Sequence, residues 1–438
     1  MRQPAAQTIA SLLLLIMPAL AQASAVFPSE SVASEHVIPP GAASTPPTNA
    51  RTIDDSAGRP GDEAANFTVR DGYAVSVAVE TVPGARFLAF DDSGTLFVSR
   101  PGRGDVLAFR DEDGDGKYER REVFISGRPK VHGLCFSGGF LWFATSGAIG
   151  KARDTDQNLR ADEITDIIPD GQLPQGGGHW YRSLLVTNDT IYTSIGDSGN
   201  ISDQEETERQ KIWAFGLDGT GKRLFASGIR NNEELLMRPG TQELWGVDHG
   251  GDWFGAPLGE FQGNQAITDL NPPDEFNRYI ENGFYGHPFL TGNRVPRFEH
   301  RERSDLLELA AKTIAPEWNI PAHWAANAFC FIETSPRPGP GAMPADHTGD
   351  AFVACRGSWN STKPVGYCIA RVLFDQGRPY GQLTIVSTLQ ESEKPGGPSV
   401  VLARPVDCVQ APDGTVLFSS DQPGRIYRVS RIPANENK

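Results

Sequence analysis

The chain has 438 residues, a formal net charge of −15 and a charged fraction of 22%, with 47 glycines and 33 prolines. A chain of this length buries a large core, which excludes a small module, and its acidic balance argues against nucleic acid or anionic membrane surfaces as partners. A neutral small molecule, or an anion bound by a local basic patch, is compatible with this composition.

The N-terminal residues resemble an export signal followed by a linker. Residues 1–25 contain Arg2, a short apolar run and three overlapping A-x-A cleavage sites, so we expect a periplasmic or secreted protein. The single early charge also fits an uncleaved anchor. Residues 26–66 are rich in Pro, Ala, Ser and Thr, which predicts a disordered linker. No later segment has about 18 consecutive apolar residues, so we expect no membrane insertion after signal cleavage.

A short β-rich run recurs along the rest of the chain. Its first four copies begin at Gly94, Gly139, Asn188 and Thr241, at spacings of about 45 to 53 residues, which suit a four-stranded propeller blade. Period-two alternation and Asp-Gly turns favour antiparallel hairpins. We therefore predict an all-β fold over residues 67–432, a six-bladed β-propeller of four-stranded antiparallel blades. Residues 67–82 would supply the strand that closes the ring, and residues 304–312 one short helix.

Residues 111–122, DEDGDGKYERRE, form an acidic turn with two readings. Asp111, Asp113 and Asp115 occupy positions one, three and five of an EF-hand-like calcium loop, with Gly116 at six and Glu122 at twelve. Against this, the segment lies in a predicted hairpin without flanking helices, where Asp-Gly pairs are ordinary turn residues. The related segment DTDQNLRADEIT lacks the glycine and the last glutamate, and we interpret it as a turn.

Basic and imidazole side chains recur where the first strand of each repeat starts. They are Arg86, His132, His179, Arg230 with Asn231, and Arg404. In a propeller these strands line the central channel, so the side chains would meet at one axial mouth. Such a gathering in an acidic protein predicts a site for a polyanionic ligand there. For His179 alone, after three glycines, an ordinary loop histidine is the simpler interpretation.

The five cysteines contain no C-x-x-C or C-x-x-C-H motif, so neither zinc nor covalent haem is indicated. Cys355 and Cys368 flank a glycine-rich loop on what we predict to be adjacent strands. They are either a disulfide or a pair of buried free thiols.

Several segments occur in a fixed order between residues 67 and 429. They are DEDGDGKYE, VHGLCF, GGGHWYRSLLVTNDTIYTSIGDSGN, GIRNNEELLMRPGTQELWGVDHGGDWFG, PPDEFNRYIENGFYGHP, CRGSWN, GYCIARVLFDQGRP and RPVDCVQAPDGTVLFSSDQPGRIYRV. In this order they resemble the soluble glucose/sorbosone dehydrogenase family, which uses pyrroloquinoline quinone (PQQ), and the sorbosone-type branch is nearest. The resemblance implies a six-bladed propeller with PQQ in the axial mouth.

The resemblance also implies roles for individual residues. His179 matches the catalytic base, and Arg230 and Asn231 match an Arg-Asn pair that contacts the cofactor, with Arg230 placed to stabilise charge on the quinone oxygen. The looser cofactor-binding matches are Arg356, Lys363 and Arg404, to which we add His132. Arg356 departs from the family pattern, which often has histidine there.

Calcium is the second implied cofactor. Gly250 and Gly251 fall where main-chain carbonyls hold the calcium on PQQ, and Glu275 and Tyr285 fall where a structural calcium is held. Calcium prefers oxygen ligands, which a Gly-Gly turn offers from its backbone. Residues 256–271 look like an insertion that covers or reshapes the mouth.

We therefore expect an exported quinoprotein dehydrogenase that oxidises a sugar, aldehyde or alcohol by hydride transfer to calcium-bound PQQ, with His179 as the base. Since the chain has no haem motif, electrons would leave to a separate acceptor. Two alternatives are a non-enzymatic propeller binding module and a calcium-dependent propeller lactonase or other hydrolase. The gathered cations favour the dehydrogenase, because a hydrolase needs carboxylates and one metal.

Overall fold

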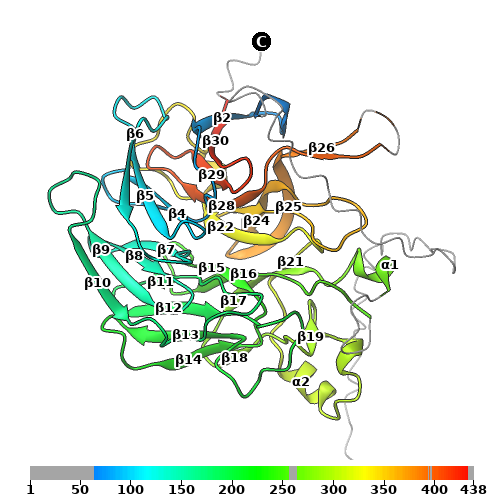
Figure 1. Ribbon diagram of the computed structural model, residues 1–438. Helices are drawn as coiled ribbons and strands as arrows, with labels where there is room; N and C mark the ends of the chain where they lie inside the picture. Colours follow the sequence, from blue (N-terminus) through cyan, green and yellow to red (C-terminus); the bar gives the residue numbers. More distant parts are fainter. Residues whose placement is uncertain (1–63, 256–263, 393, 395–396, 433–438) are drawn as a thin grey trace, which may run out of the picture. The chain divides into compact units, whose positions relative to one another are not determined.

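The structure is a computed structural model that describes residues 64–255, 264–392, 394 and 397–432 (Figure 1). The predicted signal peptide, most of the predicted linker and residues 256–263 of the predicted insertion lie outside the described residues. A single 3-10 turn, η1 (Ala64–Asn66), occupies the last three residues of the predicted linker. All described residues belong to one compact unit, Ser44–Lys438.

Six antiparallel sheets form the six blades of a β-propeller, which confirms the predicted fold class. Blade 1 contains β3 (Leu88–Phe90), β4 (Leu96–Arg100), β5 (Asp105–Arg110) and β6 (Arg120–Ile125). Blade 2 contains β7 (Leu134–Ser137), β8 (Phe140–Ala144), β9 (Ile149–Arg153) and β10 (Glu163–Ile168). Blade 3 contains β11 (Leu185–Val186), β12 (Thr190–Ile195), β13 (Lys211–Gly216) and β14 (Arg223–Ser227).

The second half of the ring follows the same plan. Blade 4 contains β15 (Asn232–Met237), β16 (Leu244–Asp248), β17 (Asp274–Tyr279) and β21 (Trp318–Ile320). Blade 5 contains β22 (Ala326–Phe331), β23 (Ala351–Cys355), β24 (Cys368–Asp375) and β25 (Arg378–Ser387). Blade 6 contains β28 (Pro405–Gln410), β29 (Val416–Ser420), β30 (Arg425–Arg431) and β2 (Tyr73–Val79).

The ring is closed by the strand that the sequence predicted. β2 pairs antiparallel with β30, from Tyr73 opposite Arg431 to Val79 opposite Ile426. Figure 1 shows the blue β2 beside the red β30. The preceding β1 (Thr68–Val69) pairs with β25, so the start of the propeller binds two neighbouring blades. The last blade is therefore built from both ends of the propeller sequence.

The second strand of each blade is buried on both faces, because every blade packs between two others. All five residues of β4 and of β23 are buried, whereas four of the six residues of the outer strand β10 are exposed. Aromatic side chains fill the layers between blades. Phe276 meets Trp245 and Phe329 at ring-centroid distances of 5.1 and 4.9 Å between blades 4 and 5. The burial of these large rings stabilises the packing of the blades.

Extra segments extend the regular blades. Two connections within blade 4 are extended. The β16–β17 connection contains α1 (Gln265–Thr268), and the longer β17–β21 connection contains β18 (Gly283–Phe284), β19 (Leu290–Thr291), β20 (Val295–Pro296), η2 (Phe298–His300) and α2 (Leu306–Lys312). β18 pairs in parallel with β14 and so ties this connection to blade 3. α2 confirms the predicted short helix. Smaller additions are η3 (Ala345–His347), β26 (Leu389–Gln390) and β27 (Val400–Val401). In the described ranges no helix is long enough to cross a bilayer, since the longest has seven residues.

All five cysteines are free thiols. Cys355 and Cys368 lie directly opposite each other on β23 and β24, as the sequence suggested, but they are not bonded. Of the two alternatives, the structure therefore has the pair of buried thiols rather than the disulfide.

Candidate active site

His179 lies at the axial mouth on the loop between blades 2 and 3. This loop passes close to the next one, because a Cβ on Gly177 would lie 2.7 Å from Ser198 Cα, and Gly177 itself has a positive φ of 82°. Arg209 Nη2 donates to the carbonyls of Gln175 and Gly176 at 2.8 and 3.1 Å. The strand expected directly after His179 begins only at β11, so hydrogen bonds to the loop position the imidazole.

The hydrogen bonds of His179 define its tautomer. Nδ1 lies 2.9 Å from the carbonyl oxygen of Asp197, which only accepts, so Nδ1 carries the proton and Nε2 keeps a free lone pair. Burial lowers the pKa of His179 well below its ordinary value, and the nearby Arg230 acts in the same direction. A neutral imidazole with a free Nε2 has the form that a general base requires.

Arg230 and Asn231 begin blade 4 beside this imidazole. The carboxylate of Asp248 accepts from both backbone N–H groups, at 2.9 Å from Arg230 and 2.6 Å from Asn231. The Arg230 side chain donates to the backbone and side-chain oxygens of Asn200 and to Asp252 Oδ1, at 2.7 to 2.9 Å. Burial raises the pKa of Asp248 to about 6. Hydrogen bonds thus fix both the backbone N–H and the guanidinium of Arg230.

A cluster of three arginines lies on the opposite side of the mouth. Arg356 donates to Asp421 Oδ2 at 2.9 and 3.0 Å, and Arg404 donates to Oδ1 at 2.9 Å. Arg86 Nη1 lies 3.5 Å from the same carboxylate. Burial opposes ionisation of Asp421, but the three arginines outweigh it and lower its pKa. Arg86 also pairs with Glu233 at 2.6 Å, so three guanidinium groups face two carboxylates, which leaves an excess of positive charge for an anionic ligand.

The sequence analysis did not select Asp421. The available signal was a recurrence, because Asp197, Asp248 and Asp421 each stand at or just after the end of the second strand of a blade. Each holds a mouth residue: Asp197 through its carbonyl, Asp248 and Asp421 through their carboxylates.

The polar floor of the mouth is centred on Glu233, another residue that the sequence analysis missed. Its Oε2 accepts from Arg86 Nη2 at 2.6 Å and from Asn327 at 3.1 Å, and its Oε1 accepts from Asn231 at 3.1 Å. The predicted cofactor ligand His132 lies in this floor with no exposed surface, between the rings of Phe87 and Tyr181. Burial lowers its pKa well below the ordinary value.

An open pocket of about 450 Å³ adjoins the arginine cluster. It is lined by Gly84, Arg86, Pro101, Gly102, Lys130, Trp180, Tyr181 and Asp421. Trp180 stacks on Tyr181 with ring centroids 4.0 Å apart, and Arg86 lies 4.5 Å above the Tyr181 ring. The predicted cofactor ligand Lys363 is exposed on the loop between β23 and β24 that begins with Arg356. The mouth thus offers both space and cations.

The residues implied for the calcium on PQQ form a tight turn next to Arg230. A Cβ on Gly250 would lie 2.5 Å from the Pro273 carbonyl oxygen, so only glycine fits this close approach. Gly250, Gly251 and His249 line a small cavity together with Arg230, Asp248 and Glu275. Asp248 and Glu275 offer this cavity carboxylate oxygens, which calcium prefers, whereas Arg230 and Arg297 line the same cavity and oppose a cation.

Buried oxygens surround the implied structural calcium ligand Glu275. Asn277 and Asn319 each have a buried side-chain oxygen with no hydrogen-bond partner among the described residues. Glu275 lies opposite Asn319 across β17 and β21, and burial raises its pKa to about 8. Acceptors without donors fit a cation. The Tyr285 hydroxyl, by contrast, donates to the Arg278 carbonyl at 2.7 Å and accepts from Ile280 N at 2.8 Å, so only its backbone is open to a metal.

The acidic turn with Asp111, Asp113 and Asp115 lies between β5 and β6, on the face opposite the mouth. Their carboxylate oxygens gather with that of Glu119 within 4.8 Å of one another, while Glu122 forms an ion pair with Arg160 at 2.7 Å. A similar cluster, Asp154, Asp156 and Asp162, forms in the segment that we interpreted as a plain turn. Both clusters are separate from the mouth residues.

Comparisons with known proteins agree with this architecture. A family model described as TrAA12-like matches residues 67–432. The holo form of the pyranose dehydrogenase PQQ domain from Coprinopsis cinerea covers 83% of this chain and 97% of its own, with 18% identity and a TM-score of 0.68. The calcium structure of the Trichoderma reesei Carbohydrate-Active Enzymes Family AA12 protein covers 84% and 97%, with 19% identity and a TM-score of 0.68. An uncharacterized protein from Borreliella burgdorferi is 26% identical over 380 residues, which are 82% of this chain and 90% of its own.

Proposed function

The chain belongs to the TrAA12-like family, and from this premise we propose that it is a quinoprotein oxidoreductase, a PQQ- and calcium-dependent sugar dehydrogenase. One observation carries the proposal: a neutral imidazole, a fixed Arg230 and the arginine cluster around Asp421 converge on one mouth. PQQ has three carboxylates, and such a ligand needs several fixed cations. The names of the similar solved structures, which include PQQ and calcium, support the same cofactors.

Each side chain has a definite task in this proposal. His179 Nε2 accepts the proton of the substrate hydroxyl, because its other nitrogen is held by the Asp197 carbonyl. Arg356 and Arg404 would bind carboxylates of the cofactor, and Arg230 would stabilise negative charge that develops on it. Carbonyls of Gly250 and Gly251 would hold calcium. PQQ supplies the acceptor for the hydride that leaves the substrate carbon.

We further propose that the substrate is a sugar, a sorbosone-type aldehyde or another alcohol. We also propose export, which residues 1–25 support, and electron transfer to a separate acceptor. The pocket of about 450 Å³ beside Trp180 and the arginine cluster provides room at the mouth for a small molecule.

The test is to titrate metal-free protein with PQQ, with and without calcium, and then to add a panel of aldoses while recording the absorbance of the quinone. We expect saturable, calcium-dependent binding and reduction by at least one sugar. His179→Gln should bind PQQ nearly as well as wild type but reduce it roughly 10²–10⁴-fold more slowly. Binding without reduction by any substrate would favour the binding module. No saturable binding in either condition would refute the proposal.

A further inference from the structure

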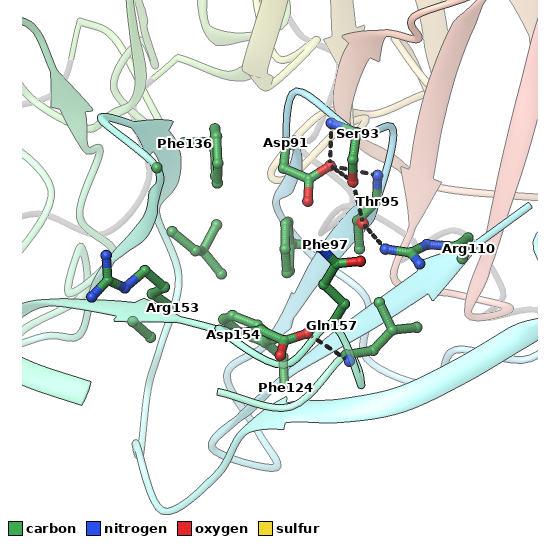
Figure 2. A pocket seen from close by; sticks show the side chains of 14 residues that line it. Asp91, Ser93, Thr95, Phe97, Arg110, Phe124, Phe136, Arg153, Asp154 and Gln157 are labelled. Carbon is green, nitrogen blue, oxygen red and sulfur yellow. Dashed lines mark hydrogen bonds between the residues drawn. The ribbon is translucent and has the colours of Figure 1, made fainter. Parts of the chain in front are cut away.

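A groove of about 450 Å³ lies between blades 1 and 2, on the face opposite the mouth. Its residues come from the β3–β4 turn, the β7–β8 turn and the β9–β10 loop, which lie on the face away from the axial mouth, and from strands β4 to β9 beside them. Figure 2 shows these side chains gathered around one opening. None of them takes part in the proposed dehydrogenase chemistry.

The groove has an apolar interior. Phe97 and Phe124 of blade 1 pack edge to face at 4.7 Å and are almost fully buried, as is Leu141 of blade 2. Phe136 of blade 2 is only partly buried. Figure 2 shows Phe136 and Phe97 on opposite walls of the groove. A ligand that enters between these walls would therefore meet aromatic carbon on both sides.

The rim of the groove carries planar polar groups with unused hydrogen-bonding capacity. Arg110 Nη2 donates to Thr95 Oγ1 at 3.2 Å, and among the described residues this is the only hydrogen bond of its side chain. The side-chain amide of Gln157 has no partner in the described part of the chain. Gln157 also has a positive φ of 62°, an uncommon backbone conformation for this residue type.

Two carboxylates on the rim already accept hydrogen bonds from backbone N–H groups of their own turns. Asp91 Oδ1 accepts from the backbone N–H groups of Ser93 and Thr95 at 2.9 and 2.7 Å, which leaves Oδ2 without a partner within the described ranges. Asp154 accepts from Leu159 N at 2.7 Å. Arg110 offsets one of these charges, whereas Arg153 is already paired with Glu163 and Asp154 lies beside Asp156 and Asp162, so the groove is acidic and disfavours an anionic ligand.

We propose that this groove is a non-catalytic binding site for one neutral pyranose unit of a carbohydrate. A pyranose has apolar C–H faces that pack against aromatic walls, and a ring of hydroxyls that both donate and accept. Arg110 supplies donors, Asp91 Oδ2 supplies an acceptor and Gln157 supplies both, which together match neighbouring hydroxyl groups. The site lies on the far face from the mouth, so it would hold a longer glycan on the protein without occupying the active site. The proposal does not depend on the proposed dehydrogenase function.

The test is isothermal titration calorimetry of PQQ-free, metal-free protein with maltohexaose, cellohexaose, xylohexaose and chitohexaose. We expect at least one of them to bind. Gln157→Ala should weaken that binding about 3–10-fold, the loss of one or two neutral hydrogen bonds, and Arg110→Ala about 10-fold or more, because its guanidinium is charged. Phe136→Ala should weaken it as well. Thermal melting verifies folding, and Arg110 and Gln157 are exposed enough for truncation to be tolerated.

Matched controls separate the groove from the mouth and from general surface effects. Arg337→Ala and Gln172→Ala remove the same side-chain types from exposed positions elsewhere, and both should bind as wild type does. Arg404→Ala alters the mouth and should also leave this binding unchanged. The proposal is overturned if none of the four hexasaccharides binds, or if the groove variants bind as tightly as the controls.

Discussion

Truncation of Glu233 tests how far burial, rather than distance, decides the strength of an ion pair in this propeller. Glu233 lies 2.6 Å from Arg86, and Glu163 lies 2.5 Å from Arg153, so the two pairs are almost equally short. Their surroundings differ, because the Glu233 side chain is 3% exposed and the Glu163 side chain is 50% exposed. A distance criterion alone predicts the same loss for both.

The structure predicts very different losses. Glu233→Ala leaves the buried Arg86 with one carboxylate partner, Asp421 at 3.5 Å, besides its contacts with His132 and the Tyr181 ring. It also removes an acceptor from Asn231 and Asn327. Breaking a buried ion pair costs about 3–5 kcal/mol, so we expect the free energy of unfolding to fall by about 4 kcal/mol. Glu163→Ala should cost about 0–1 kcal/mol, since water replaces the lost partner. Glu233→Gln keeps one acceptor oxygen, so its loss in the free energy of unfolding should lie between those of the two alanine variants.

Urea unfolding followed by tryptophan fluorescence measures the three variants against wild type, with equal slopes as the condition for comparing midpoints. The expected order of stability is wild type and Glu163→Ala, then Glu233→Gln, then Glu233→Ala. If Glu233→Ala and Glu163→Ala lose the same stability within about 0.5 kcal/mol, the argument from burial is wrong, and the network in the floor of the mouth does not stabilise the fold.

Three further predictions concern the mouth. Gly250→Ala should destabilise the protein by about 1–3 kcal/mol, because its Cβ would lie 2.5 Å from the Pro273 carbonyl oxygen. The control Gly102→Ala places its Cβ in open space and should melt at nearly the wild-type temperature. Equal melting temperatures for the two variants would contradict this prediction. Arg404→Ala should raise the Kd for PQQ about 10-fold or more, measured by fluorescence quenching, and an unchanged Kd would show that the cluster is only a solvated rim. Burial raises the pKa of Glu275 to about 8, so the metal-free folded protein holds a proton that the unfolded chain releases near pH ~4, and its stability should fall as the pH rises between these values. Urea midpoints at several pH values should show this fall in wild type and less of it with calcium. In Glu275→Gln the fall should be smaller, above all between about pH 6 and 8, because the buried Asp248, with a pKa of about 6, contributes at lower pH; an unchanged fall in that variant would refute the assignment.

The repeat pattern was sufficient to predict the blades, because each blade is built from residues that are near one another in the sequence. The closing strand was predictable too, since a blade with only three strands at the C-terminus leaves one strand to be supplied by residues 67–82. The burial pattern of the strands was less well predicted. Buried and exposed residues were expected to alternate, but β4 and β23 are buried along their whole length between neighbouring blades.

The charged residues of the mouth were only partly predictable. Cations at the starts of the first strands could be found because they recur at one position of the repeat. Asp421 stands at a recurring position of the repeat, but its role and that of Glu233 depend on partners from other blades, and the pairing of Arg86 with both exists only in the closed ring. His132, like His179, comes shortly before the first strand of its blade, but the strand registers align it with Arg182, and Tyr181 and Phe87 cover it. Such covering depends on neighbouring loops that no local pattern describes.

The pairing of β2 with β30 has a consequence for the order in which the protein matures. During synthesis, β2 cannot pair with β30 until almost the whole chain has been made. Until then five blades can associate, but their two end surfaces stay open to solvent and to other chains. A chain that stops before Arg425 would keep most of the mouth residues and still lack a closed ring. We therefore expect ribosomes that stall late on this message to release aggregation-prone chains. Complete synthesis yields a ring in which β2 and β30 pair and cover the two open blade surfaces.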